Sequence, residues 1–244
     1  MTKRGIVSCV VMGLVVLTLV GCAGDARIVE SRQTEAVVDG RSGLELDVGA
    51  GDLFVEGVAD LDTVEVEVDL MTARHVLAED DRASDSLTFE LDARDDDTLR
   101  LVVQIDDGPP GYYADVRVRV PMAMAIDALD GSGDLDVRDV ASLTLNDGSG
   151  EIQVERVAGA VRIEDGSGDL VVDGAASVDI RDDSGEIRVQ RVTGDVTIED
   201  ASGDIELDLI EGTATVGDGS GDIVAGEVGE LVVSEDGSGE VIRR

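Results

Sequence analysis

The chain has few of the residues that build the common active sites. Its 244 residues include no tryptophan, one histidine (His75) and two cysteines, and only 2% are aromatic. Both cysteines, Cys9 and Cys22, lie near the N-terminus, outside the predicted domain. Nucleophilic triads, cysteine–histidine pairs and zinc sites therefore lack the side chains they need. We expect a protein that is not an enzyme and has no small-molecule substrate.

Positive charge is also scarce. The chain carries 55 Asp and Glu residues against 19 Lys and Arg, a formal charge of −36, and Lys3 is its one lysine. Such a surface repels nucleic acid and anionic headgroups, so we expect neither as a partner. The acidity indicates either a halophilic surface or cation binding. The regular alternation of Val, Ile and Leu excludes a disordered acidic chain for most of the length.

The N-terminus predicts an exported lipoprotein. Lys3 and Arg4 precede an apolar run, residues 5–20, which is too short and wrongly flanked for a spanning helix. Leu19-Val20-Gly21-Cys22 resembles the lipobox of bacterial lipoproteins. That resemblance implies a signal peptide over 1–21, lipidation of Cys22 and anchoring to the extracytoplasmic side of a membrane. An ordinary secretory signal with an incidental cysteine is the alternative.

Three further segments follow the signal peptide. Residues 22–41 are polar, without a clear period, and predict a tether. Residues 42–129 predict an N-terminal β region, in which Gly49-Ala50-Gly51-Asp52 looks like a degenerate copy of the motif repeated later. Residues 130–244 hold the regular repeats.

The strongest pattern is a repeat of Asp-x-Ser-Gly-[Asp/Glu]. Its seven serines, at successive spacings of 17, 18, 17, 18, 18 and 18 residues, are Ser132, Ser149, Ser167, Ser184, Ser202, Ser220 and Ser238. A short, nearly constant period is typical of a solenoid. Apolar pairs such as Ile152/Val154 and Val161/Ile163 recur in each repeat, with a single apolar residue such as Val157 between them. Because each pair has the period of a strand, we predict an all-β, parallel β-solenoid with two short strands per repeat.

Acidic residues flank every repeated serine and form two predicted columns. The column before the serines is Asp130, Asp147, Asp165, Asp182, Asp200, Asp218 and Asp236; the column after them is Asp134, Glu151, Asp169, Glu186, Asp204, Asp222 and Glu240. A purely structural corner, with glycine at positive φ, accounts for the motif. The alternative is that the two columns of oxygen ligands, about 4.8 Å apart from repeat to repeat, bind Ca²⁺.

One pair of aromatic residues is a candidate recognition site. Tyr112-Tyr113 follows Gly-Pro-Pro-Gly, which predicts a loop. Loop tyrosines often anchor a partner, although packing against the flank of the solenoid also explains them.

The repeats also resemble a known family, the putative adhesins of unknown function. The resemblance covers residues 42–242 and rests on Gly49-Ala50-Gly51-Asp52, on 116–121 (Val-Arg-Val-Arg-Val-Pro) and on 131–137 (Gly-Ser-Gly-Asp-Leu-Asp-Val). It implies a β-helix-like domain on envelope proteins, with no catalytic residues to transfer.

Three hypotheses of function follow. The first is a lipid-anchored surface protein that presents the solenoid for adhesion to an envelope protein or glycan. The second is a structural module of the envelope that depends on Ca²⁺. The third is an enzyme that acts on polysaccharides. This hypothesis is the least favoured, because such enzymes stack sugars on aromatic side chains and residues 130–244 contain no aromatic residue.

Overall fold

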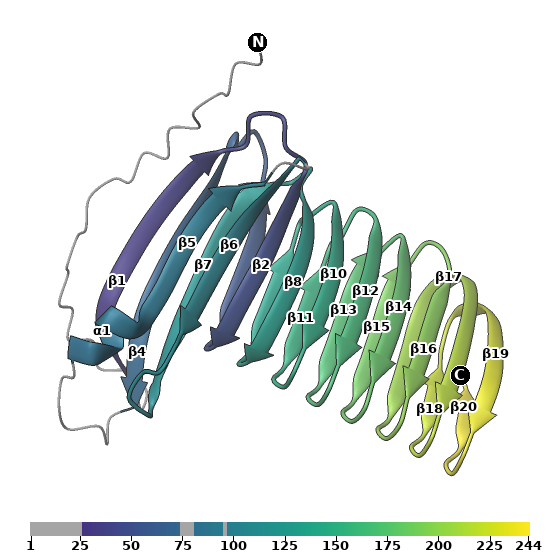
Figure 1. Cartoon of the computed structure of the whole chain (residues 1–244). Coiled ribbons are helices and arrows are strands. Elements are labelled where there is room, and N and C mark those ends of the chain that lie inside the picture. Colours follow the sequence, from purple (N-terminus) through teal and green to yellow (C-terminus); the bar gives the residue numbers. More distant parts are fainter. Residues whose placement is uncertain (1–25, 74–80, 95–96) are drawn as a thin grey trace.

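The computed structural model describes residues 26–73, 81–94 and 97–244, which fold into two facing stacks of strands wound as a β-solenoid (Figure 1). The fold prediction is confirmed. The predicted signal peptide, Cys22 and His75 lie outside the described residues. Within them, no helix is long and apolar enough to cross a membrane.

Each strand of the regular repeats pairs in parallel with the equivalent strand of the next repeat. Leu135 lies beside Ile152, which lies beside Leu170, so the register follows the 17- and 18-residue spacing of the sequence. The strands are β8 (Ala125–Ser132), β9 (Leu135–Arg138), β10 (Ser142–Asp147), β11 (Ile152–Glu155), β12 (Ala160–Asp165), β13 (Leu170–Ala175), β14 (Ser177–Asp182), β15 (Ile187–Val192), β16 (Val196–Asp200), β17 (Ile205–Asp218), β18 (Ile223–Ala225), β19 (Val228–Asp236) and β20 (Val241–Arg243).

The N-terminal region continues both stacks with a different connectivity. It comprises β1 (Ala26–Val37), β2 (Gly43–Ala50), β3 (Leu53–Val58), β4 (Thr63–Ala73), helix α1 (Asp81–Ser86), β5 (Leu87–Ala93), β6 (Thr98–Ile105) and β7 (Tyr112–Pro121). β2 lies between β6 and β8, and β3 lies between β7 and β9, all in parallel. Ala50 pairs with Ser132, which confirms that the early Gly-Ala-Gly-Asp segment is a copy of the repeated corner.

The alternating apolar residues form one continuous core. Ile152, Val154, Val161 and Ile163 are each at most 1% exposed, and Val157, which fills the corner between the two pairs, is 3% exposed. The predicted period-2 faces are therefore the buried faces. Each repeat contributes only a few side chains, so the core exists only when neighbouring repeats cover one another.

Glycine at the corner is required by two independent constraints. Gly168 has a φ of +146°, and a Cβ atom on it would lie 1.7 Å from the carbonyl oxygen of Gly150 in the preceding repeat. Gly185 and Gly203 have the same geometry against the glycine one repeat earlier. The prediction of a glycine-specific corner is confirmed, because a side chain would clash with the backbone of the next layer.

Two boundaries predicted from the sequence are wrong. Residues 26–37 of the predicted tether form β1, which pairs antiparallel with β4. Its polar sequence reflects its position at the edge of the stack, where one face is open to solvent. The predicted start of the repeats at residue 130 falls inside β8, whose Ile126 and Ala128 are already core residues.

The last repeat is only partly covered. β20 pairs with β18, and Val241 is 42% exposed. The Arg243 guanidinium donates a hydrogen bond of 2.9 Å to the carbonyl oxygen of Leu231 on β19, so its side chain reaches across this end of the molecule.

Candidate functional site

The two acidic columns lie on opposite sides of the corner backbone. The column before the serines ends the strands of one stack, and its described side chains are buried, with exposed fractions from 2% to 7%: Asp130, Asp147, Asp165, Asp182, Asp200 and Asp218. We call this set the inner column. The column after the serines, from Asp134 to Glu240, is solvent-exposed and is called the outer column. The side chain of Asp236 lies outside the described residues.

The inner column reaches the interior because it continues the alternation of each strand. In β12, Val161, Ile163 and Asp165 all point inward. The Asp165 Oδ1 atom accepts a hydrogen bond of 3.2 Å from the backbone N–H of Ser167, and Asp182, Asp200 and Asp218 make the same bond to the serine two residues later. This is the side-chain turn that aspartate favours before a tight corner. The inner carboxyls of these four residues thus hold the backbone of the corner by a hydrogen bond from its buried side.

The aspartates of the outer column connect successive repeats. The Asp134 Oδ1 atom accepts a hydrogen bond of 3.1 Å from the backbone N–H of Glu151, and the Asp169 Oδ1 atom accepts one of 3.0 Å from Glu186. Asp204 and Asp222 do the same for the repeat that follows each of them. These carboxylates therefore satisfy backbone donors that face solvent at the corner.

The geometry gives no support to calcium binding by the two columns. In the described part of the chain, no group of three or more Asp, Glu, His or Cys side chains is placed to hold a metal ion. The corner backbone separates the inner carboxyls from the outer ones, so the two columns do not converge on a shared ion. Calcium binding stays a prediction from the sequence.

Burial raises the pKa of the inner carboxyls. Burial, reinforced by the neighbouring Asp147 carboxylate, raises the pKa of Asp130 to about 8. The pKa of Asp165 rises to about 7 and that of Asp200 to about 6, again mainly through burial and secondarily through adjacent aspartates of the column. Burial also raises the pKa of Asp147 and of Asp182. A buried column of like charges favours the neutral acid.

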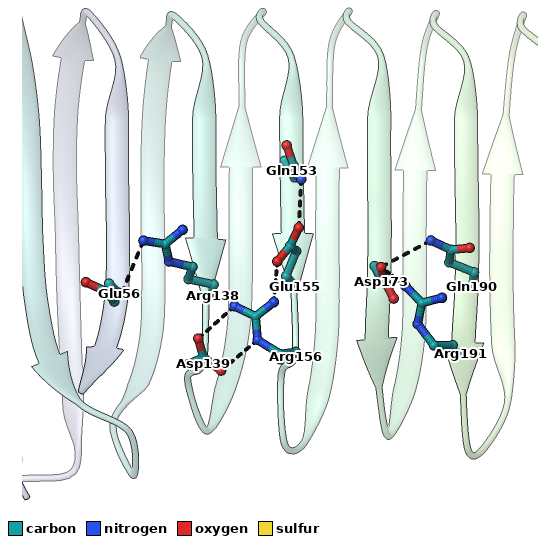
Figure 2. Close-up of polar contacts among 9 residues, drawn as sticks. All are labelled: Glu56, Arg138, Asp139, Gln153, Glu155, Arg156, Asp173, Gln190 and Arg191. Carbon is teal, nitrogen blue, oxygen red and sulfur yellow. Dashed lines mark hydrogen bonds and ion pairs between the residues drawn. The ribbon is translucent and has the colours of Figure 1, made fainter. Parts of the chain in front are cut away.

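The outward face of the β9–β11–β13–β15 stack carries ion pairs that link neighbouring repeats (Figure 2). Arg156 binds Asp139 of the preceding repeat at 2.8 Å and also pairs with Glu155. Gln190 and Arg191 both contact Asp173 of the preceding repeat. Exposed pairs contribute little individually, so this face is a regular polar surface rather than a major source of stability.

A groove of ≈ 560 Å³ lies over the N-terminal strands β1, β4, β7 and β3. Outward side chains form two rows across these strands. One row is Gln33, Glu67, Arg117 and Phe54, and the other is Glu35, Glu65, Arg119 and Glu56. The rows combine hydrogen-bond donors, acceptors and one aromatic ring.

The ring of Phe54 is held by its surroundings. The Arg138 guanidinium stacks over it at 4.5 Å from the ring centre and also binds Glu56 at 3.1 Å. On the neighbouring strand, Arg119 binds Glu65 at 2.5 Å and Arg117 binds Asp69 at 2.8 Å. The groove therefore has an ordered floor. Phe54 is not among the site residues predicted from the sequence, although its outward position in the first, degenerate repeat was a usable signal.

The predicted recognition loop is wrong in its position. Tyr112 and Tyr113 begin β7 and pair with Thr72 and Met71 of β4. Tyr112 is only 9% exposed and belongs to the core, so packing against the flank, the interpretation that the sequence favours over recognition, describes it. The turn formed by the preceding glycines and prolines ends earlier than expected, because aromatic residues favour strands.

Comparison with protein families now identifies the chain. The model of the Toastrack DUF4097 family matches residues 83–234. The protein belongs to this family. None of the curated proteins compared with it shows significant sequence similarity.

One solved structure shares the fold at low sequence identity, and two others are weaker matches. A putative adhesin from Bacteroides fragilis is 14% identical, with a TM-score of 0.52 over 88% of this chain and 98% of that one. A putative adhesin from Parabacteroides distasonis is 16% identical, with a TM-score of 0.48 over 88% and 97% of the two chains. A putative lipid binding protein from the same species is 15% identical, with a TM-score of 0.47 over 87% and 94%. At such identities the Bacteroides fragilis structure supports the fold alone.

Proposed function

We propose that this Toastrack protein is a non-enzymatic, lipid-anchored protein of the cell envelope, and that its solenoid is a rigid support for adhesive contacts. The observation that carries the proposal is the groove around Phe54, which places an ordered aromatic ring among alternating Arg and Glu side chains. The anchor at Cys22 and the extracytoplasmic location rest on the lipobox sequence. The description of the Bacteroides fragilis protein as a putative adhesin agrees with this role.

The chemistry of the groove favours a neutral glycan over a protein. A sugar ring can pack against the part of Phe54 that lines the groove, while Arg117, Arg119 and Glu67 offer donors and acceptors to its hydroxyl groups. The net charge of −36 repels acidic glycans. The small size of the groove suits a short segment of a chain rather than a standard protein interface.

Binding to immobilised oligosaccharides tests the proposal. The full-length chain is applied to a panel of neutral and acidic oligosaccharides, beside Phe54→Ala and a control, Val232→Ala, which truncates an exposed apolar residue of β19. We expect binding to neutral members, weakened about 10-fold or more by Phe54→Ala because stacking is lost. Equal binding by Phe54→Ala, or no binding to any neutral glycan, contradicts a glycan site in this groove.

The anchor requires a separate measurement. Mass spectrometry of the chain extracted from membranes is expected to show a mature N-terminus at an acylated Cys22. The Cys22→Ser variant is expected to appear in the soluble fraction. An unmodified cysteine in a membrane-free protein would refute the lipoprotein part of the proposal without affecting the groove.

A further inference from the structure

The inner column contains buried carboxyl oxygens that make no hydrogen bond of normal geometry. In the described part of the chain, neither side-chain oxygen of Asp130 or Asp147 has a hydrogen-bond partner, and the same holds for the Oδ2 atoms of Asp165, Asp182 and Asp200. These residues are at most 7% exposed. A buried carboxylate without a donor carries a large desolvation cost, which a proton removes.

The register places each of these carboxyls beside the next. Asp147 pairs with Asp165, Asp165 with Asp182, and Asp182 with Asp200, through three successive parallel ladders. The strands of a sheet lie about 4.8 Å apart, so two side chains of the column come within reach of each other. When one carboxyl of a pair is protonated, its O–H can donate to the unpartnered oxygen of its neighbour. Two ionised carboxylates at this spacing would only repel each other.

The charged groups around the column do not neutralise it. Asp52 acts on Asp130, and Asp183 acts on Asp182, both as further negative charges. A hollow of ≈ 520 Å³ beside the middle of the column is lined by Glu164, Asp165, Arg181, Asp182, Asp183, Glu199, Asp200 and Ala201. The guanidinium group that lines this hollow belongs to Arg181, which forms ion pairs with Glu199 at 3.0 Å and with Glu164 at 3.6 Å. The hollow therefore lies beside the column, and its guanidinium is already paired with carboxylates.

We propose that the inner column is a proton-binding site, in which buried aspartates of adjacent repeats share protons at neutral pH and release them to solvent at higher pH. Each shared proton replaces charge repulsion between two repeats with a hydrogen bond. The column then holds the repeats together most strongly when it is protonated. No metal ion is required for this role.

The sign of the pH dependence follows from the raised pKa values. The pKa of Asp130 in the fold is about 8, against an ordinary value of 3.8, so the folded chain binds more protons than the unfolded chain between these limits. Stability therefore falls as the pH rises through this interval. Below about pH 4 the full contribution is present, because both states are then protonated at these residues.

Infrared spectroscopy of the full-length chain tests the proposal, because a protonated carboxyl has a carbonyl stretch distinct from that of a carboxylate. Three forms are compared: wild type, an inner triple variant (Asp147→Asn, Asp165→Asn, Asp182→Asn) and an outer triple variant (Asp134→Asn, Asp169→Asn, Asp204→Asn). Both variants replace three aspartates of the corner with asparagine. Asparagine retains the oxygen that accepts the corner hydrogen bond at Asp165, at Asp182 and at the three outer positions, so the variants differ mainly in burial.

Wild type and the outer variant are expected to show protonated carboxyl at about pH 6 and to lose it by about pH 9, whereas the inner variant, which keeps Asp130 and Asp200, shows a clearly smaller signal at about pH 6. The unfolding midpoint of wild type is expected to fall by about 5 °C or more over that range, and that of the inner variant to change less. If the inner variant fails to fold, Asp165→Asn and the wild-type spectrum decide the question.

Three results would overturn the proposal. The first is the absence of protonated carboxyl in wild type at about pH 6. The second is an equal signal in wild type and the inner variant. The third is loss of the signal on adding CaCl₂ at constant ionic strength, with a higher midpoint in wild type only, which would make the column a cation site.

Discussion

The regular repeats and the N-terminal region build the same two stacks by different means. From β8 onward, each strand pairs in parallel with its equivalent in the next repeat, and a glycine corner connects the stacks. In the N-terminal region β4 pairs antiparallel with both β1 and β7, and β5 pairs antiparallel with β6. The repeats therefore depend on a close approach of backbones at every corner, whereas the antiparallel strands depend on ordinary side-chain packing.

This difference separates the proposed functions. The repeats place identical carboxyls in register, which produces the buried inner column and the exposed outer column. The N-terminal region breaks the periodicity and so brings unlike side chains, such as Phe54 and Arg117, into one groove. Regularity favours a collective property such as proton sharing, while irregularity favours a specific site.

Gly168→Ala, compared with Gly40→Ala, tests the corner and has the largest expected effect. Both glycines have positive φ, +146° and +81°, but a Cβ atom on Gly168 meets the carbonyl oxygen of Gly150 at 1.7 Å, whereas one on Gly40 has no atom within 4 Å. We expect Gly168→Ala to lower the free energy of unfolding by about 3 kcal/mol or more, and Gly40→Ala by about 1 kcal/mol. Urea unfolding measures both. Equal losses would show that the corners tolerate a shift of the neighbouring repeat.

The repeats could be predicted well from the sequence because the same pattern of apolar residues and glycine recurs in each of them. The alternation around Ile152 and Val154, the single corner residue Val157 and the glycine at 150 all recur, so an error in one repeat would conflict with the others. Strand β1 offers no such check. Its polar residues 30–35 read as a tether, and only the antiparallel partner β4 makes them a strand.

The acidic columns show a second limit. Their positions were predicted, but whether Asp165 faces inward depends on where β12 ends relative to the corner. The sequence also leaves unresolved that Asp165 and Asp169, four residues apart, lie on opposite sides of the backbone, one buried and one exposed. The groove could not be predicted at all, since it joins side chains from β1, β3, β4 and β7.

Leu209→Gly tests the second corner, where the repeats tolerate residues other than glycine. Leu209 has a φ of +55° and is 41% exposed, and the equivalent position in an earlier repeat is Gly174, with a φ of +91°. Left-handed backbone is costly for leucine, so we expect Leu209→Gly to raise the free energy of unfolding by about 0.5–1 kcal/mol. Leu209→Ala is the control, since it removes the side chain but keeps the strained conformation. A gain with alanine as large as that with glycine would assign the effect to the exposed side chain instead.

Arg138→Ala tests the border between the two regions and has the smallest expected effect. Arg138 is on β9, the first regular repeat, yet its guanidinium stacks on Phe54 and binds Glu56 of β3. Losing a partly exposed ion pair and a stacking contact, both screened by solvent, should cost about 0.5 kcal/mol. Thermal unfolding measures this cost, with Arg181→Ala as a control, because Arg181 binds Glu164 and Glu199 on the exposed face and should leave the midpoint unchanged. If both variants lose the same stability, the ion pair of Arg138 contributes no more than an ordinary surface ion pair. If only Arg138→Ala does, the first regular repeat braces the floor of the groove, and Phe54 should become more mobile in that variant.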